Sequence, residues 1–284
     1  MFGQFRPWLD CDRHCSFCYL TEEQRKITDI EKRQALLHLS SSLSDETKEC
    51  DTIGLIGGEL FTDDKFFHEW LCVADSFRNA DHIKRIFIGT HLLGDVDFML
   101  DFCQMVGKEI QVCTSYDPAG RFYNDDLSKW VENIKAVQEC GHKVVVSSTL
   151  SDALMHDDTT LPDGVDFKLQ PLFDTEKWLE DICSRTHDGQ VYNAELRTKV
   201  KNLPKRADVL KWFAEHKDVA KDYSTYDDKH ASILWDYDRE NKHYNRSKFI
   251  CTTHTAECGH PLIAYCYADS DRCTMCDAKV IADE

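Results

Sequence analysis

Between residues 50 and 175 the sequence alternates short apolar runs with longer segments of helical periodicity. Five apolar runs have the length and composition of buried strands: residues 52–56, 86–88, 110–113, 143–146 and 165–172. Helical spacing of apolar residues marks three intervening segments: residues 66–77, 96–106 and 125–140. Strands that alternate with helices in this way predict βαβ units and a parallel sheet.

A further unit precedes this region, with a strand expected near residues 5–8 and a helix at 29–43. The total of about six strands falls short of the eight that close a full barrel. The sequence therefore predicts an α/β fold, a partial (β/α)6 TIM-like barrel with its core at residues 5–175. In such folds ligands bind at the carboxyl ends of the strands, so functional residues should follow each strand directly.

Beyond residue 175 the pattern changes. One more helix is expected at residues 205–216, and the polar, acidic stretch 218–248 has the composition of a connector. Residues 249–284 form a cysteine-rich tail. The predicted organisation is a barrel at 1–217, a connector at 218–248 and a small metal-binding domain at 249–284.

Charge and hydropathy restrict the partners and the compartment. A net charge of -17 argues against duplex DNA as a main partner, because phosphate binding depends on Lys and Arg. The chain shows neither an apolar run of membrane-spanning length nor a signal-peptide pattern at its start, so we expect a cytoplasmic protein without membrane contacts. Because thiols stay reduced in the cytosol, the 14 cysteines suggest metal binding rather than disulfides.

The cysteines are placed unevenly, with three at residues 11–18 and five at residues 251–276. The scattered ones are interpreted as small apolar residues of the core: Cys50, Cys72, Cys103, Cys113, Cys140 and Cys183. The N-terminal group has the spacing Cys11-x3-Cys15-x2-Cys18. Three thiolates in one short loop can hold three irons of a cubane and leave the fourth iron open, which is typical of a reactive centre.

Together with Phe17 before the last cysteine and Gly57-Gly58-Glu59 after the second strand, this spacing resembles the radical S-adenosylmethionine (SAM) superfamily. The resemblance implies a [4Fe–4S] cluster whose open iron is chelated by SAM, and a Gly-Gly-Glu turn that contacts the SAM amino group. It also implies reductive cleavage of SAM to a 5′-deoxyadenosyl radical, with an electron from a flavodoxin or ferredoxin. A zinc knuckle that includes His14 is the alternative interpretation of these thiolates.

Polar residues after the later strands are further candidates. In the family, residues after the fourth strand meet the SAM ribose, which points to Ser115 and Asp117. Ser147 and Ser148 follow the fifth strand, and Gln170 lies on the sixth; His91, after the third, is treated as structural, since a lone histidine usually is. The predicted cofactor-binding residues are Phe17, Gly57, Gly58, Glu59, Ser115, Asp117, Ser147 and Gln170; no catalytic residue is assigned.

Two alternative metal sites fit the tail. Its thiolates resemble the auxiliary-cluster domains (SPASM or twitch type) that follow many radical SAM barrels, which favours a second [4Fe–4S] cluster on Cys251, Cys258, Cys266, Cys273 and Cys276. Tetrahedral zinc is the alternative, since Cys251-x2-His254 and Cys273-x2-Cys276 have zinc-finger spacing and His260 offers a further ligand.

The sequence thus predicts a radical SAM enzyme. By analogy with auxiliary-cluster relatives, a peptide or small metabolite is the favoured substrate, while a nucleotide or modified DNA base fits the same chemistry. The rival prediction is a non-catalytic binding protein that carries zinc or an iron–sulfur cluster on the same scaffold. The Gly-Gly-Glu turn favours the enzyme, because an inactive scaffold need not keep it.

Overall fold

A computed structural model gives the arrangement of most of the N-terminal half and of several later strands. It describes residues 1–13, 15, 20, 22–118, 121–123, 125–150, 154, 156–157, 161–171, 186–187, 190–191, 208, 211, 230–256, 261–266 and 280–281. Phe17 and Cys18 lie outside the described residues, as does most of the helix expected at 205–216.

One large sheet organises the fold, and its parallel part runs in the spatial order β9-β1-β2-β3-β4-β5-β6. Its strands are β1 (Phe2–Arg6), β2 (Thr52–Leu55), β3 (Arg85–Gly89), β4 (Glu109–Tyr116), β5 (Lys143–Leu150), β6 (Asp166–Pro171) and β9 (His230–Asp238). Strands β1 to β6 are neighbours in chain order, each pair joined by a crossover. This order confirms the predicted partial (β/α)6 barrel.

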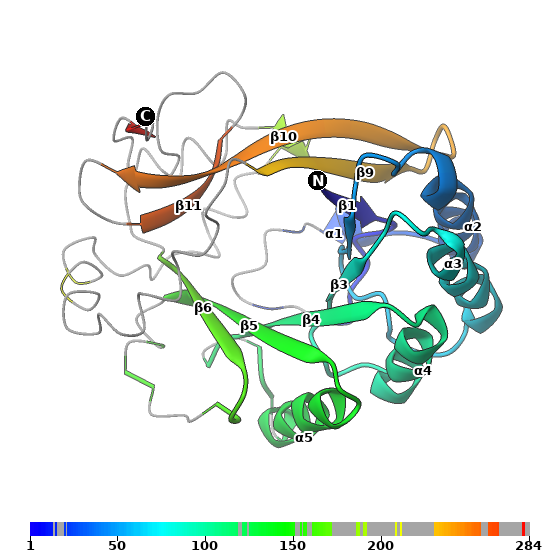
Figure 1. Ribbon diagram of the computed structural model, residues 1–284. Coiled ribbons are helices and arrows are strands. Elements are labelled where there is room, and N and C mark those ends of the chain that lie inside the picture. The colour runs from blue at the N-terminus through cyan, green and yellow to red at the C-terminus, as the bar shows by residue number, and fades with distance from the viewer. Residues whose placement is uncertain are drawn as a thin grey trace.

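Helices cover the outer face of the curved sheet, as Figure 1 shows along its right and lower sides. They are α2 (Asp29–Asp45), α3 (Phe67–Asn79), α4 (Val96–Val106) and α5 (Asp126–Glu139), whereas the short helix α1 (Glu22–Arg25) lies beside β1 in Figure 1. The bounds of α4 and α5 follow the apolar periodicity of the sequence to within one residue. Helix α2 begins at a capping box in which Thr28 and Glu31 satisfy each other's backbone N–H groups, and Gly107 ends α4 in the left-handed conformation.

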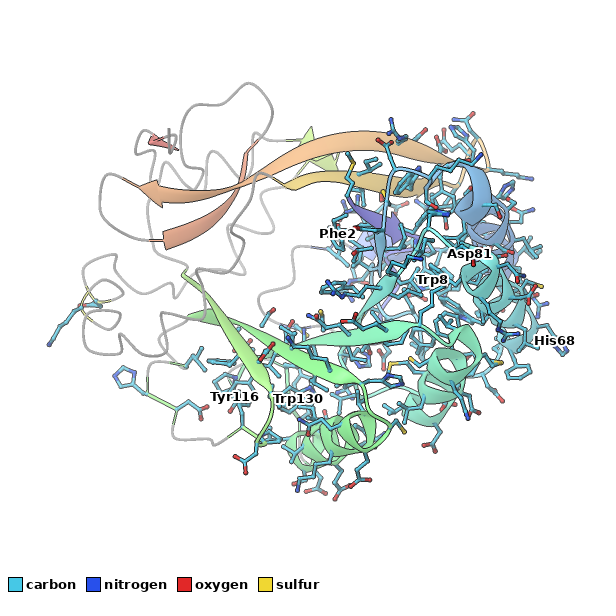
Figure 2. The ribbon with its side chains drawn as sticks, viewed as in Figure 1. Phe2, Trp8, His68, Asp81, Tyr116 and Trp130 are labelled. Carbon is cyan, nitrogen blue, oxygen red and sulfur yellow. The ribbon has the colours of Figure 1, made fainter. Side chains whose placement is uncertain are left out.

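The core lies between the helices and the sheet and is rich in aromatic side chains. Phe61, Trp70, Phe102 and Trp130 are fully buried. Tyr116 of β4 packs on Trp130 of α5 with 5.7 Å between the ring centroids (Figure 2). Large aromatic rings at these positions fix α3, α4 and α5 against the strands, and so hold the ends of the strands in place.

The stretch 218–248, expected to be a connector, contains strand β9 and the first part of β10 (His243–Ala256). Strand β9 adds to the barrel beside β1, and Trp235 of β9 stacks on Phe5 with 4.7 Å between the centroids. The polar composition of the stretch hid the apolar run Ile233–Leu234–Trp235, which is buried. The physical reason for the difference is that β9 is a barrel strand with only a short apolar centre.

Strand β10 turns back antiparallel to β9 and pairs with β11 (Pro261–Cys266) and β12 (Val280–Ile281), while β7 (Thr186–His187) and β8 (Gln190–Val191) form a separate pair. The predicted domain boundaries remain predictions. Within the described part of the chain, the helices are too short or too polar to cross a membrane.

Candidate active site

A cavity of about 280 Å³ opens at the carboxyl ends of β1 to β5, where the fold predicts a ligand. Its wall combines thiols, glycines and polar side chains from several strand ends. The lining residues are Cys11, Arg13, Cys15, Leu20, Ile56, Gly57, Gly58, Gly89, Thr90, His91, Cys113, Thr114, Ser115, Arg121 and Ser147. The first two predicted iron ligands and the predicted SAM turn therefore share one cavity.

The thiols of Cys11 and Cys15 lie on the segment that follows β1. Cys15 is buried, and Cys11 is partly exposed to the cavity. Burial raises the pKa of the Cys11 thiol to about 11, and the negative charges of Glu59 and Asp12 add to the rise. Since a metal binds the thiolate, metal loading at Cys11 must release a proton.

The backbone of this segment continues the pairing of β1 with β2. The N–H of Gly58 donates to the Trp8 carbonyl at 3.1 Å, and the N–H of Glu59 donates to the Asp10 carbonyl at 2.8 Å. A Cβ atom at Gly57 would lie 2.2 Å from the Trp8 carbonyl oxygen, and one at Gly58 would lie 1.9 Å from that of Asp10. Only glycine permits this approach, so the turn is glycine-rich because it touches the cysteine segment.

Two arginines join the cysteine segment to other elements, one of them within the segment and one on α1. Arg13 donates to Asp126 at the start of α5 at 2.6 Å. Arg25 of α1, which is buried, donates to the carbonyls of Cys11 at 3.2 Å and Arg13 at 2.5 Å. These contacts hold the segment to α1 and α5, with Cys11 and Cys15 on the cavity wall.

The Glu59 carboxylate is buried, and Glu59 is not part of the cavity wall. It accepts four hydrogen bonds, from Leu60 N at 3.0 Å, Phe61 N at 3.1 Å, Thr90 Oγ1 at 2.9 Å and His91 N at 2.8 Å. Its donors come from its own turn and from the segment after β3. The geometry therefore leaves Gly57 and Gly58, rather than the Glu59 carboxylate, on the cavity wall.

His91 is joined to the cysteine segment. Its Nδ1 accepts a hydrogen bond from the N–H of Leu93 at 2.9 Å, so the ring proton of the neutral imidazole lies on Nε2. This Nε2–H donates to Oδ1 of Asp12 at 2.7 Å. The same hydrogen bond is the largest cause of the lowered pKa of the Asp12 carboxyl.

Cys11, Asp12 and His91 place potential metal-binding atoms within 4.8 Å of one another. A metal-bound histidine usually donates its other N–H to an acceptor. Here that nitrogen already accepts from Leu93, so the tautomer opposes metal binding through Nε2. Both ring nitrogens of His91 are engaged in hydrogen bonds, which leaves the thiols as donors. A set of thiol donors fits an iron–sulfur cluster better than a mixed zinc site.

The remaining predicted residues differ in their relation to the cavity. Ser115 of β4 and Ser147 of β5 line it and are register partners in neighbouring strands. Asp117 is buried but is not part of the cavity wall, and the side chain of Gln170 lies outside the described residues. In the tail, Cys251 pairs with Tyr265 and Cys266 with Ile250, while Cys258, Cys273 and Cys276 lie outside the described residues.

Several contributors to the site did not emerge from the sequence. Asp12 and Arg13 occupy the variable positions of the cysteine motif, and Arg25 and Arg121 carry no motif, although Arg121 follows the end of β4, where the strand-end rule places functional residues. The interpretation of the scattered cysteines as core residues holds for Cys50 and Cys103, which are buried. It is wrong for three others, because Cys72 and Cys140 are exposed and Cys113 lines the cavity. Cys183 lies outside the described residues.

No protein-family model matches the sequence, and no curated protein matches it. Among solved structures, the chain is similar to Streptococcus suis SuiB bound to precursor peptide SuiA, with a TM-score of 0.46 and 14% identity over 83% of this chain and 57% of that one. It is also similar to native anSMEcpe with bound AdoMet, with a TM-score of 0.44 and 12% identity over 75% of this chain and 60% of that one. The complex of anSMEcpe with AdoMet and Cp18Cys peptide gives a TM-score of 0.44 and 13% identity over 75% of this chain and 60% of that one. The chain spans less than two thirds of the length of each of these proteins.

Proposed function

We propose that this chain is a radical SAM enzyme that holds a [4Fe–4S] cluster on Cys11, Cys15 and Cys18. Such a cluster, when bound, supplies the electron that cleaves SAM to methionine and a 5′-deoxyadenosyl radical, which removes hydrogen from a substrate. A partial barrel with its cavity at the carboxyl strand ends is the scaffold that this chemistry implies.

One observation carries the proposal: Cys11 and Cys15 share a single cavity wall with Gly57 and Gly58. A structural zinc site needs four protein ligands that fill its coordination sphere, and it does not require a glycine turn packed against the thiol segment. The potential fourth ligands near Cys11 are bonded to each other, since His91 donates to Asp12. Among the described residues this supports an iron left open for SAM; His14, the further ligand of the zinc alternative, lies outside them.

The residues of the wall have distinct roles in this proposal. Carbonyl groups of the Gly57–Gly58 turn accept hydrogen bonds from the SAM amino group, because an amino group needs acceptors. Ser115 and Ser147 offer hydroxyls to the ribose from the neighbouring strands β4 and β5. Glu59 does not contact SAM in this proposal; its buried carboxylate fixes the turn by accepting backbone hydrogen bonds.

The substrate class and the partners are proposed by analogy with auxiliary-cluster enzymes, with a peptide or small metabolite as substrate and a flavodoxin or ferredoxin as reductant. The tail is proposed to hold a second [4Fe–4S] cluster, with zinc as the alternative.

Anaerobic reconstitution with iron and sulfide, followed by dithionite and SAM, tests the function. The expected result is release of 5′-deoxyadenosine by the wild type and none by a Cys11→Ala/Cys15→Ala/Cys18→Ala variant. Cys72→Ala is the matched control, because this thiol is exposed and remote from the cavity wall. A fully loaded cluster with intact SAM would instead identify the non-catalytic binding protein.

A further inference from the structure

Three segments meet beside the cavity: the cysteine segment at residues 8–12, the turn at 57–59 and the residues after β3 at 90–91. The first two are joined through the backbone, since Gly58 N–H and Glu59 N–H donate to the cysteine segment. The indole Nε1 of Trp8 also donates to the Glu59 carbonyl at 2.9 Å. The backbone bonds prolong the β1–β2 ladder past the end of both strands, and the indole adds a side-chain bond to them.

The turn is joined in its own way to the residues after β3. Both the Thr90 hydroxyl and the His91 N–H donate to Oε2 of Glu59, at 2.9 and 2.8 Å. The carboxylate is buried, so water does not compete for these bonds. This second link fixes the backbone of His91, and Nδ1 of its ring lies 3.3 Å from the same Oε2.

A third link joins the residues after β3 to the cysteine segment, so that each of the three segments contacts the other two. It is a bond between two side chains. His91 Nε2 donates to Asp12 Oδ1 at 2.7 Å, which ties the residue next to Cys11 to the end of β3. The His91 ring is 4% exposed and its tautomer is set by Leu93, whereas half of the Asp12 side chain is exposed. The rigid partner is therefore the histidine, and the residue that it holds in place is Asp12.

We propose that Asp12 and His91 are a positioning pair that holds the Cys11 thiol segment against the Gly57–Gly58 turn. The inference rests on the proposed function for its consequence, because the distance between cluster and turn decides whether SAM can reach both. Ladder bonds hold the segment as far as Asp10. Beyond that point, the His91 bond and the Arg25 contacts position Cys11.

A pair of matched substitutions isolates the bond. Asp12→Ala removes the acceptor, whereas Asp12→Asn keeps a carbonyl oxygen that can accept from His91 Nε2–H. His91→Ala removes the donor but keeps the backbone N–H that binds Glu59. His82→Ala is the control, since His82 bonds to Thr47 at 2.8 Å away from the cavity wall.

The first readout is SAM affinity, measured by equilibrium dialysis on reconstituted protein of known iron content. We expect a Kd about tenfold higher for Asp12→Ala and His91→Ala, and a double variant no weaker than either single one, because the two residues act as one unit. Asp12→Asn should bind nearly as the wild type does, and the SAM-induced change in the EPR signal should follow affinity. Additive effects, or equal losses in the Ala and Asn variants, would overturn the proposal.

The second readout needs neither cluster nor SAM. In the protein without metal, Cys11 alkylation should be faster in Asp12→Ala than in Asp12→Asn, because both variants remove the charge that raises the pKa of the Cys11 thiol and only Asp12→Asn keeps the acceptor. It should also be faster in His91→Ala than in His82→Ala. Equal rates within both pairs would overturn the pair as a positioning device. If wild-type protein fails to bind SAM while the alkylation pattern appears, the proposed function fails and the positioning pair stands.

Discussion

Arg6 of β1 and Asp236 of β9 form a two-point ion pair, although 230 residues separate them in the sequence. They are also register partners in the parallel ladder. The Arg6 side chain is 7% exposed and that of Asp236 17%. A charge pair this deep favours β9 as the strand beside β1, because the ladder places the guanidinium and the carboxylate in the same register position.

We therefore expect Asp236→Ala to lower the free energy of unfolding by about 3 kcal/mol, because it leaves a buried cation without its main counter-charge. Urea unfolding of the metal-free protein measures this. Lys143→Ala is the control: it breaks the Lys143–Asp166 ion pair, which joins two half-exposed side chains and should contribute less than about 1 kcal/mol. Equal losses in both variants would show that burial does not strengthen the Arg6 pair.

Gly58→Ala tests the contact between the turn and the cysteine segment. A Cβ atom would lie 1.9 Å from the Asp10 carbonyl oxygen, so the backbone must separate. We expect the variant to lose most of its iron after reconstitution, as measured by iron and sulfide analysis. Gly107→Ala is the matched control, because Gly107 also resists substitution through its positive φ of 63° but has nothing within 4 Å, and should cost about 1–2 kcal/mol without loss of iron.

The sequence predicts the barrel well because its signals are local. The periodicity of residues 96–106 and 125–140 gives α4 and α5 almost to the residue, since both helices bury one apolar stripe. Strand β9 escapes prediction because its neighbour is β1, more than 200 residues away, and its short apolar centre lies in a polar stretch.

The candidate site likewise contains residues that the sequence identifies and contacts that it does not. Cys11, Cys15, Gly57 and Gly58 are visible as motifs, and the structure brings them together in one cavity. The bond between Asp12 and His91 depends on tertiary structure, because it joins the end of β1 to the end of β3. No spacing rule relates such residues, so sequence reasoning treated His91 as a lone structural histidine and passed over Asp12.

Thiol reactivity should follow burial. Burial raises the pKa of the Cys50 thiol to about 11 and that of Cys103 to about 12, and both side chains are 1% exposed. Cys72 and Cys140 are exposed. At pH 8 we expect iodoacetamide to modify the exposed pair at least about 100-fold faster, since the thiolate is the reactive form. Peptide mass spectrometry gives the rates; comparable rates at Cys103 and Cys72 would contradict the packing of α4.

The turn between β9 and β10 should make stability depend on pH in acid. Hydrogen bonds from the side chain and backbone of Asn241 are the main cause that lowers the pKa of Asp238 from 3.8 to about 2. A lowered pKa means that the carboxylate contributes stability above about pH 4, and that this contribution is lost as the pH falls through 2.

Urea midpoints of wild type and Asp238→Asn, measured on metal-free protein between pH 2 and 6, should therefore converge as the pH falls. Glu240→Gln removes the same charge from the same turn and controls for net charge. A gap between wild type and Asp238→Asn that stays constant to pH 2 would exclude the hydrogen-bonded carboxylate as its source.

The cysteine-rich tail can be tested without the barrel cluster. The Cys11→Ala/Cys15→Ala/Cys18→Ala variant removes the N-terminal site, so any metal that remains belongs to residues 251–276. We expect about four irons and four sulfides per chain to remain if the tail thiolates hold a cluster. About one zinc and no sulfide would establish the tetrahedral alternative.

Adding Cys273→Ala and Cys276→Ala to that variant should then release the residual metal, because both proposed sites use these two thiolates. Cys72→Ala and Cys140→Ala serve as the matched pair, since both thiols are exposed and carry no proposed role. Strands β10 and β11 pair Cys251 with Tyr265 and Cys266 with Ile250, so neither cysteine lies directly opposite the other in the ladder. If the triple variant holds neither iron nor zinc, the tail is no metal site and the resemblance to auxiliary-cluster domains does not extend to its chemistry.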